Sequence, residues 1–164
     1  MPIIYRTYEP GDEVGLADLF NHAFHQSGVG WLRTPHLLKW RYVDRPHAKL
    51  EEIQIAVDQT TNRIIGSVFS TIERYQFQNR IYRVGSINDV GVYPGYGGQG
   101  IAQTLMAQAM RFCTDQQCDL SILVADPYGF ARSHIYQPLG FEDFIPFVIQ
   151  FKPTLFLAWY FPIL

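Results

Sequence analysis

The sequence predicts a mixed α/β fold in which an antiparallel meander of strands is followed by a βαβ unit. Three observations support this prediction. Four strand-like segments occur within the first 92 residues, and the last three follow one another with only polar turns between them. A turn in which four of residues 95–100 are glycine then precedes an amphipathic helix pattern. A short apolar strand follows this helix, and a strand, a helix and a second strand in this order form a βαβ unit.

The composition agrees with one globular domain. A chain of 164 residues can bury roughly 70% of its unfolded surface, which is enough for a core of its own. The net charge is −2, from 13 basic and 15 acidic residues, and no basic run is present, so we expect no nucleic-acid partner. The N-terminus lacks a basic region followed by an apolar one, so we expect no secretory signal and a cytoplasmic location.

The first two elements are a strand and a helix. Residues Ile3 to Tyr8 alternate in polarity and are rich in β-forming types, which predicts a strand. Pro10 suits a first helical turn, and the helix is expected to end near His25. Apolar residues at three-four spacing mark its buried face: Leu16, Leu19, Phe20, Ala23 and Phe24.

The region Trp31 to Pro46 combines aromatic and arginine side chains around a second short helix that begins at Pro35. Two interpretations stay open. Trp31 and Trp40 line one wall of a substrate pocket together with the guanidinium groups, or Trp40 packs in the core beneath arginine stems. The group consists of Trp31, Arg33, Trp40, Arg41, Tyr42 and Arg45.

Three strands are expected in the meander: Glu52–Val57, Ile64–Glu73 and Ile81–Val92. Polar turn formers at 58–62 and at Gln76–Asn79 separate them. Glycines inside a strand often mark a bulge or a close approach by another part of the chain. We therefore expect such a feature at Gly85 and Gly91.

The helix after the glycine turn has an apolar stripe that should lie on the sheet: Ile101, Ala102, Leu105, Met106, Ala109, Phe112 and Cys113. The apolar run Leu120–Ala125 predicts a strand buried on both faces. A short helix should then end at Gln137, before Pro138 and with Gly140 past its end. Glu142–Lys152 is expected to form a final strand or hairpin partner.

The last residues form an uncharged apolar tail at 153–164. The uncharged segment from Leu155 has ten residues and is too short for a bilayer, which requires about twenty residues. We expect the tail to be buried within the protein or in a homodimer contact, because it lacks a basic face for lipid headgroups. Cys113 and Cys118 are expected to be free thiols, and no ligand set for a metal accompanies them.

The glycine-rich turn predicts a phosphate site. The first amides of a helix have no intrahelical acceptor, and the helix dipole is positive there. A simple tight turn is the alternative. Gly95-x-Gly97-x-x-Gly100 followed by Asp126 also imitates a dinucleotide fingerprint. Against that fingerprint, Pro94 separates the strand from the first glycine, and too little chain follows for a doubly wound domain.

Two motifs resemble those of one family. Val92-x-Pro94-x-Tyr96-x-Gly98-x-Gly100-Ile101-Ala102, preceded by Asp89-Val90, is similar to the acyl-CoA signature of the GNAT superfamily of N-acetyltransferases. Ile135-Tyr136-x-x-Leu139-Gly140-Phe141-Glu142 resembles the second landmark of the same family. The resemblance covers residues 3–152, and residues 1–164 are therefore expected to form a single acyltransferase domain.

The resemblance implies a twisted mixed sheet with helices on both faces, in which Ile81–Val92 splays from Leu120–Ala125. Pantetheine would pair with the main chain of Val90, Gly91 and Val92 in the gap. The pyrophosphate of acetyl-CoA would bind the amides of Gly97, Gly98, Gln99, Gly100, Ile101 and Ala102. The family usually has Arg or Gln where this chain has Gly97, so a side-chain contribution is missing there.

The implied reaction transfers an acetyl group from acetyl-CoA to a primary amine of a small molecule or peptide, by direct attack in a ternary complex. Tyr136 matches the family's tyrosine that protonates the leaving thiolate, and a phenol suits that role at neutral pH. Asp89 is the candidate base, directly or through water, and its alternative role is a carboxylate on a β-bulge held by backbone amides. His134 is a weaker candidate.

A domain of the same fold that binds acyl-CoA without catalysing transfer is the alternative function.

Overall fold

A computed structural model describes residues 2–24 and 32–144 of the chain. Trp31 and the tail at 153–164 lie outside the described residues. The expected strand Glu142–Lys152 lies mostly outside them as well, and its first three residues have no regular secondary structure.

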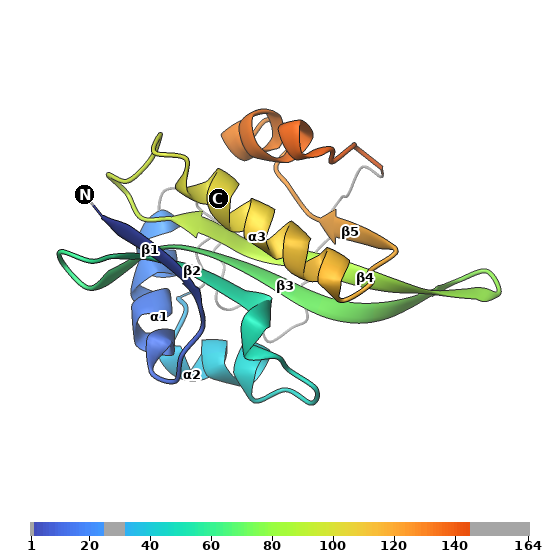
Figure 1. Cartoon of the computed structure of the whole chain (residues 1–164), viewed down its shortest axis with the longest axis horizontal. Coiled ribbons are helices and arrows are strands. Elements are labelled where there is room, and N and C mark those ends of the chain that lie inside the picture. Colours follow the sequence, from blue (N-terminus) through green and yellow to red (C-terminus); the bar gives the residue numbers. More distant parts are fainter. Residues whose placement is uncertain (1, 25–31, 145–164) are drawn as a thin grey trace, which may run out of the picture.

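The described chain contains a five-stranded mixed sheet with the order β1-β2-β3-β4-β5 (Figure 1). Successive strands from β1 to β4 pair antiparallel, and β5 pairs with β4 in parallel. The predicted meander followed by a βαβ unit is therefore confirmed. The strands are β1 Ile3–Thr7, β2 Ile53–Asp58, β3 Arg63–Phe77, β4 Arg80–Val92 and β5 Leu120–Leu123.

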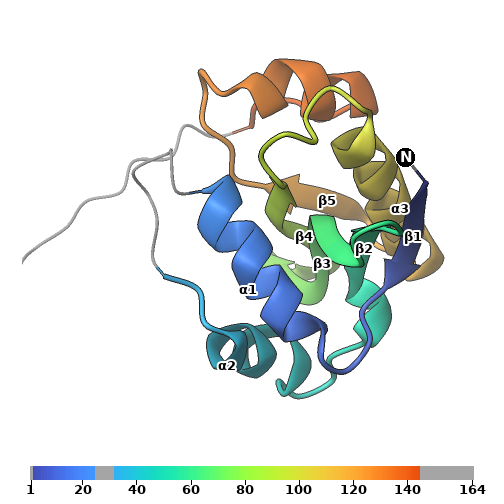
Figure 2. The same cartoon turned by 90° about the vertical axis from the view of Figure 1, so that its left-hand side faces the viewer.

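Helices cover both faces of this sheet, as Figure 2 shows, with α1 on one side and α3 on the other. The α-helices are α1 Asp12–Ala23, α2 Pro35–Leu38 and α3 Ile101–Asp115. Shorter helical turns complete the described chain: a π-helical turn Lys39–Val43, a 3-10 turn Leu50–Glu52, a π-helical turn Arg132–Tyr136 and a 3-10 turn Gln137–Leu139.

The two faces of the sheet have separate cores because β2 and residues 64–71 of β3 are buried on both sides. On the α1 side, Leu16, Leu19 and Phe20 pack with Phe69 of β3. On the α3 side, a stripe of Ile101, Leu105, Met106 and Ala109 packs on the other face. The predicted apolar faces of both helices are thus the faces that contact the sheet, except that Phe112 is only partly buried and belongs to neither core.

Several local predictions were wrong at their boundaries. Pro10 precedes α1, because Gly11 is its N-cap with φ of 105°. The β3–β4 hairpin turns only at residues 78 and 79, so β3 continues to Phe77. Pro138 lies within the 3-10 turn after Tyr136, because a proline early in a helical turn loses no hydrogen bond there. Gly140 does follow this turn, with φ of 88°.

The prediction that the strand after α3 is buried on both faces was also wrong. Leu120 and Ile122 of β5 are 43% and 40% exposed, and residues along β5 alternate in burial. The physical reason is that β5 is the edge strand of the described sheet, and no described element covers its outer face. No helix among the described residues is long and apolar enough to cross a membrane.

The glycines inside β4 are sites of close approach, as predicted. A Cβ at Gly91 would lie 3.3 Å from the Phe20 ring of α1. A Cβ at Gly85 would overlap Sγ of Cys113, which lies on α3 at the opposite face of the sheet. Glycine at these two positions lets one helix pack closely on each side of β4.

Replacing Gly85 by Ala should lower the free energy of unfolding by about 2 kcal/mol, because the new methyl group overlaps Cys113 in a packed core. Urea unfolding measures the loss. The double variant Gly85→Ala/Cys113→Ala makes room for the methyl group, so its loss should be smaller than the sum of the two single losses. If the loss in the double variant equals the sum of the two single losses, the contact between residue 85 and Cys113 does not limit packing.

Candidate active site

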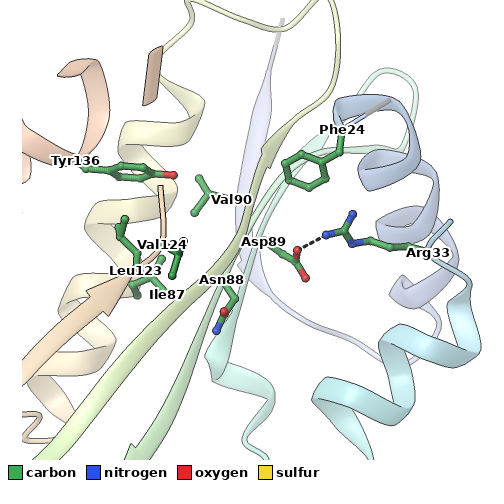
Figure 3. A pocket seen from close by; sticks show the side chains of 9 residues that line it. All are labelled: Phe24, Arg33, Ile87, Asn88, Asp89, Val90, Leu123, Val124 and Tyr136. Carbon is green, nitrogen blue, oxygen red and sulfur yellow. Dashed lines mark hydrogen bonds and ion pairs between the residues drawn. The ribbon is translucent and has the colours of Figure 1, made fainter. Parts of the chain in front are cut away.

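A pocket lies where β4 and β5 separate. The two strands pair only from Val84 to Ile87 on β4 and over Leu120–Leu123 on β5. Beyond this region β4 continues to Val92, whereas β5 ends. The resulting pocket has a volume of about 290 Å³ and is shown in Figure 3. Its lining residues are Phe24, Arg33, Ile87, Asn88, Asp89, Val90, Leu123, Val124 and Tyr136.

A β-bulge in β4 shapes one wall of this pocket. Asn88 pairs with Phe69 and Gly91 pairs with Ser67, so two residues of β4, Asp89 and Val90, lie opposite one residue of β3. Asp89 has φ of 45°, a left-handed conformation that Asp tolerates better than most side chains. An extra residue bends a strand and increases its twist, which turns the end of β4 away from β5.

The bulge is held by side chains from the α2 region. Oδ1 of Asp89 accepts a hydrogen bond from Nη2 of Arg33 at 2.6 Å, and Oδ2 accepts one from the Tyr42 hydroxyl at 2.7 Å. The Asp89 side chain is 10% exposed. Burial, followed by the nearby Asp89 charge, raises the pKa of Tyr42, so its hydroxyl stays protonated and remains a donor.

Arg33 is itself held in position from α1. Its guanidinium lies over the Phe24 ring at 4.7 Å and the Phe20 ring at 5.3 Å. Its backbone is fixed by Asn21, whose side chain accepts from the Arg33 amide at 2.8 Å and donates to the Arg33 carbonyl at 2.9 Å. The ion pair therefore connects α1, the segment before α2 and the bulge of β4.

Tyr136 faces the bulge from the opposite side of the gap. It lies in the π-helical turn Arg132–Tyr136 and is 8% exposed, and Figure 3 shows its hydroxyl directed across the gap toward Val90. Burial raises the pKa of this phenol above its usual value. The Tyr136 hydroxyl therefore stays protonated at neutral pH. His134 stacks on Phe130 with 3.9 Å between ring centroids and does not line the pocket.

The glycine-rich turn begins where β4 ends and leads into α3. Gly95, Gly98 and Gly100 have φ of 89°, 76° and 74°, which other residues rarely adopt. Gly100 is the N-cap of α3, and no side chain accepts a hydrogen bond from the first amides of the helix.

The two long helices differ in the charge of their first turns. That of α1 contains Asp12 and Glu13, whereas that of α3 has no acidic residue. The N-terminus of α3 is therefore open to an external anion.

The structure brings some of the predicted site residues together at the pocket and places others away from it. Asp89, Val90 and Tyr136 meet at the pocket, and Gly91 and Val92 continue β4 toward the glycine turn. The side chains of Ile101 and Ala102 are buried against the sheet, while Gly97, Gly98 and Gln99 are exposed. Trp40 is 64% exposed, so the interpretation that it packs in the core was wrong. It is not among the lining residues, and its substrate role remains a prediction.

Sequence reasoning gave no site role to five of the lining residues: Phe24, Ile87, Asn88, Leu123 and Val124. Phe24 was assigned only to the buried face of α1, and its position at the end of that apolar stripe was the available signal. Asn88 precedes the bulge, and no sequence pattern indicated a site role for it. Among the described residues, no group of three His, Cys, Asp or Glu side chains is placed to hold a metal ion.

Comparison with known proteins identifies one family. The family model described as an acetyltransferase (GNAT) domain matches residues 4–144. No curated protein sequence matches the chain significantly. An acetyltransferase structure from Trypanosoma brucei is 23% identical with a TM-score of 0.64, and the match covers 94% of this chain and 100% of the other.

Two further solved structures contain CoA. An aminoglycoside N-acetyltransferase in complex with CoA is 19% identical, with a TM-score of 0.71 and coverage of 93% of this chain and 96% of the other. The NatC complex bound to Gag peptide and CoA contains a chain that is 20% identical, with a TM-score of 0.70 and coverage of 88% and 87%. At these identities the likeness shows a shared fold.

Replacing Arg33 by Ala should lower the free energy of unfolding by about 2 kcal/mol, because the Asp89 carboxylate is left largely buried without its cation. A fully buried pair would lose more, but Arg33 is 21% exposed. Urea unfolding measures the effect, and Arg111→Ala, at an exposed position of α3, is the control. Equal stability of the two variants would contradict a structural role for the ion pair.

Proposed function

Because the chain belongs to the GNAT acetyltransferase family, whose domain model matches residues 4–144, we propose that it is an acetyl-CoA-dependent N-acyltransferase. Its acceptor is a primary amine of a small molecule or peptide. The observation that carries this proposal is the pocket between the separated ends of β4 and β5, with Tyr136 on one side of the gap and Asp89 on the other.

The main chain of β4 and of the turn provides binding groups for the acyl donor. Beyond Ile87, the edge of β4 that faces β5 has no strand partner among the described residues, so the backbone of Val90, Gly91 and Val92 is available to a pantetheine amide chain. The amides of residues 97–102 at the start of α3 suit a pyrophosphate, since the turn has no acidic residue or side-chain cap.

The chemistry requires a proton donor and a proton acceptor. The neutral amine attacks the thioester carbonyl carbon, the carbon–sulfur bond breaks, and the departing thiolate takes a proton. Tyr136 is the proposed acid, because its phenol is buried, directed into the gap and protonated at neutral pH. The backbone amides at the bulge are the proposed donors to the developing oxyanion.

Asp89 is the proposed base, acting through a water molecule. Each carboxylate oxygen already accepts one hydrogen bond, from Arg33 or from Tyr42. Each oxygen retains a second lone pair, so the carboxylate can still receive a proton from water in the pocket. Arg33 and Phe24 lie on the same side of the gap as the Asp89 carboxylate. The amine is proposed to enter the pocket from this side.

The acceptor class is supported by the two CoA-containing neighbours, of which one is an aminoglycoside N-acetyltransferase and the other binds a peptide. The proposal includes a cytoplasmic location, because Cys113 and Cys118 are both free thiols and such thiols are usual in reducing compartments. A homodimer contact through the tail remains a prediction.

Two measurements test the function. Thermal unfolding is followed with acetyl-CoA, with NAD and without ligand, since a ligand at 100 times its dissociation constant stabilises by about 2.7 kcal/mol. Thiol release from acetyl-CoA is then followed with a panel of small-molecule and peptide amines. Stabilisation by NAD alone would contradict the proposal, and CoA binding without turnover would favour the non-catalytic binding domain.

Replacing Tyr136 by Phe should lower kcat about 100-fold while leaving the dissociation constant of CoA unchanged, because only the proton donor is lost. An acid acts in its protonated form, and burial raises its pKa above the usual value of about 10. The wild-type kcat should therefore fall only above about pH 10, and the variant should lack this fall. Tyr128→Phe, at a residue 96% exposed, is the matched control.

Replacing Gly97 by Arg should tighten CoA binding about fivefold, because a guanidinium can reach the phosphates. Gly97 has no positive φ, and a Cβ there would meet no atom within 4 Å. Calorimetric titration measures the affinity. Gly97→Ala should have no effect, and Gly98→Arg should not help because Gly98 has φ of 76°. Unchanged affinity in Gly97→Arg would place the pyrophosphate elsewhere.

A further inference from the structure

We propose that the hydrogen bond from Tyr96 to Asp58 acts as a strut that holds the glycine-rich turn in its anion-binding conformation before CoA binds. The inference rests on the proposed function, because it assumes that this turn receives the pyrophosphate. It makes Tyr96 and Asp58 positioning residues, since both are expected to act on CoA through the backbone of the turn and not by contact with the reacting atoms.

The turn has little packing of its own. A Cβ at Gly95, Gly97, Gly98 or Gly100 would meet no atom within 4 Å, so these four residues lie in open surroundings. Glycine also loses more conformational entropy on ordering than any other residue. A backbone of this kind needs an external contact if its amides are to keep a fixed direction in the absence of ligand.

Tyr96 supplies that contact from the middle of the turn. Its hydroxyl donates to Oδ2 of Asp58 at 3.0 Å, and its amide donates to the Tyr93 carbonyl at 3.1 Å. Its ring meets the Tyr93 ring edge-on at 6.4 Å and packs against the core on the α3 side. Among residues 95–100, only Tyr96 and Gln99 have side chains, and Gln99 is exposed.

Asp58 is a rigid partner for this hydroxyl. It is the last residue of β2, is 1% exposed, and pairs with Ile3 of β1 and Arg63 of β3. Its carboxylate already accepts from the Thr60 amide and from the Thr61 hydroxyl, each at 2.9 Å. These bonds orient the carboxylate independently of Tyr96, so the turn is tied to the sheet and not to another loop.

The charge of Asp58 strengthens the strut. Burial acts to raise the pKa of this carboxyl, but the hydrogen bonds from Thr60, Thr61 and Tyr96 outweigh burial and lower the pKa. The group is therefore ionised at neutral pH, and a hydrogen bond to an ionised acceptor is stronger than one between neutral groups. A turn held in its bound conformation loses less entropy on binding, and the gain appears as affinity for CoA.

Calorimetric titration of the whole chain with CoA tests the strut. Tyr96→Phe should weaken the dissociation constant about tenfold, which corresponds to about 1.4 kcal/mol. Tyr93→Phe is the matched control, because Tyr93 lies at the start of the same turn and its hydroxyl makes no hydrogen bond within the described part of the chain. That control should bind CoA within about twofold of the wild type.

Kinetics separate positioning from catalysis. In Tyr96→Phe the KM for acetyl-CoA should rise in proportion to the dissociation constant, while kcat at saturating acetyl-CoA should stay near the wild-type value. Asp58→Asn should weaken CoA binding too, and the double variant should lose less affinity than the sum of the two single losses. A fall in kcat with unchanged KM would overturn the positioning role.

Hydrogen exchange of the unliganded protein provides a readout that does not depend on activity. Amides of residues 97–102 should exchange faster in Tyr96→Phe than in Tyr93→Phe, while amides of β2 should be unchanged, which also shows that the variant is folded. Equal exchange and equal CoA affinity in these two variants would overturn the strut. Failure of the wild-type chain to bind CoA would instead refute the proposed function.

Discussion

The extra residue in β4 is the constraint on which the site depends. Asp89 and Val90 share a single partner residue on β3, and the strand bends there, just beyond its last pairing with β5. Holding Asp89 in a left-handed conformation costs about 1–2 kcal/mol, and its hydrogen bonds with Arg33 and Tyr42 offset this cost because each involves a charged group. The separation of β4 from β5 is therefore maintained by contacts on the α1 side of the sheet, although the gap opens toward Tyr136.

The gap lies between the two faces of the sheet, each of which carries its own core. On one side lie the start of α3 and Tyr136, which belong to the two family motifs. On the other side lie Arg33, from the segment before α2, and Phe24, from the C-terminal end of α1. The fold is shared with an aminoglycoside N-acetyltransferase and with a chain of the NatC complex bound to Gag peptide, at 19% and 20% identity. If the proposed transfer takes place here, Arg33 and Phe24 are lining residues outside the motifs that could distinguish one amine from another.

Glycine has two different roles in this chain. Gly85 and Gly91 allow α3 and α1 to approach β4, so their role is one of packing. Gly95, Gly98 and Gly100 adopt left-handed backbone conformations in open surroundings, so their role is conformational. The first kind contributes to a rigid sheet. The second kind leaves a turn that depends on Tyr96 and the buried Asp58 for its order.

The order of strands and helices, the apolar faces of α1 and α3, and the glycine turn before α3 could be predicted from the sequence, because these features follow from local periodicity and from residues that are adjacent in the chain. The two motifs also contain Asp89, Val90 and Tyr136, which line the pocket, while their chemical roles stay predictions. The partners of the polar site residues could not be predicted.

Asp89 is 56 residues from Arg33 and 47 from Tyr42, and Tyr96 is 38 residues from Asp58. Such contacts depend on strand register, on the bulge and on how α1 packs on the sheet, and a local sequence pattern specifies none of these. The exposure of β5 has the same cause, since an apolar strand is buried only where the tertiary structure places other elements on both of its faces.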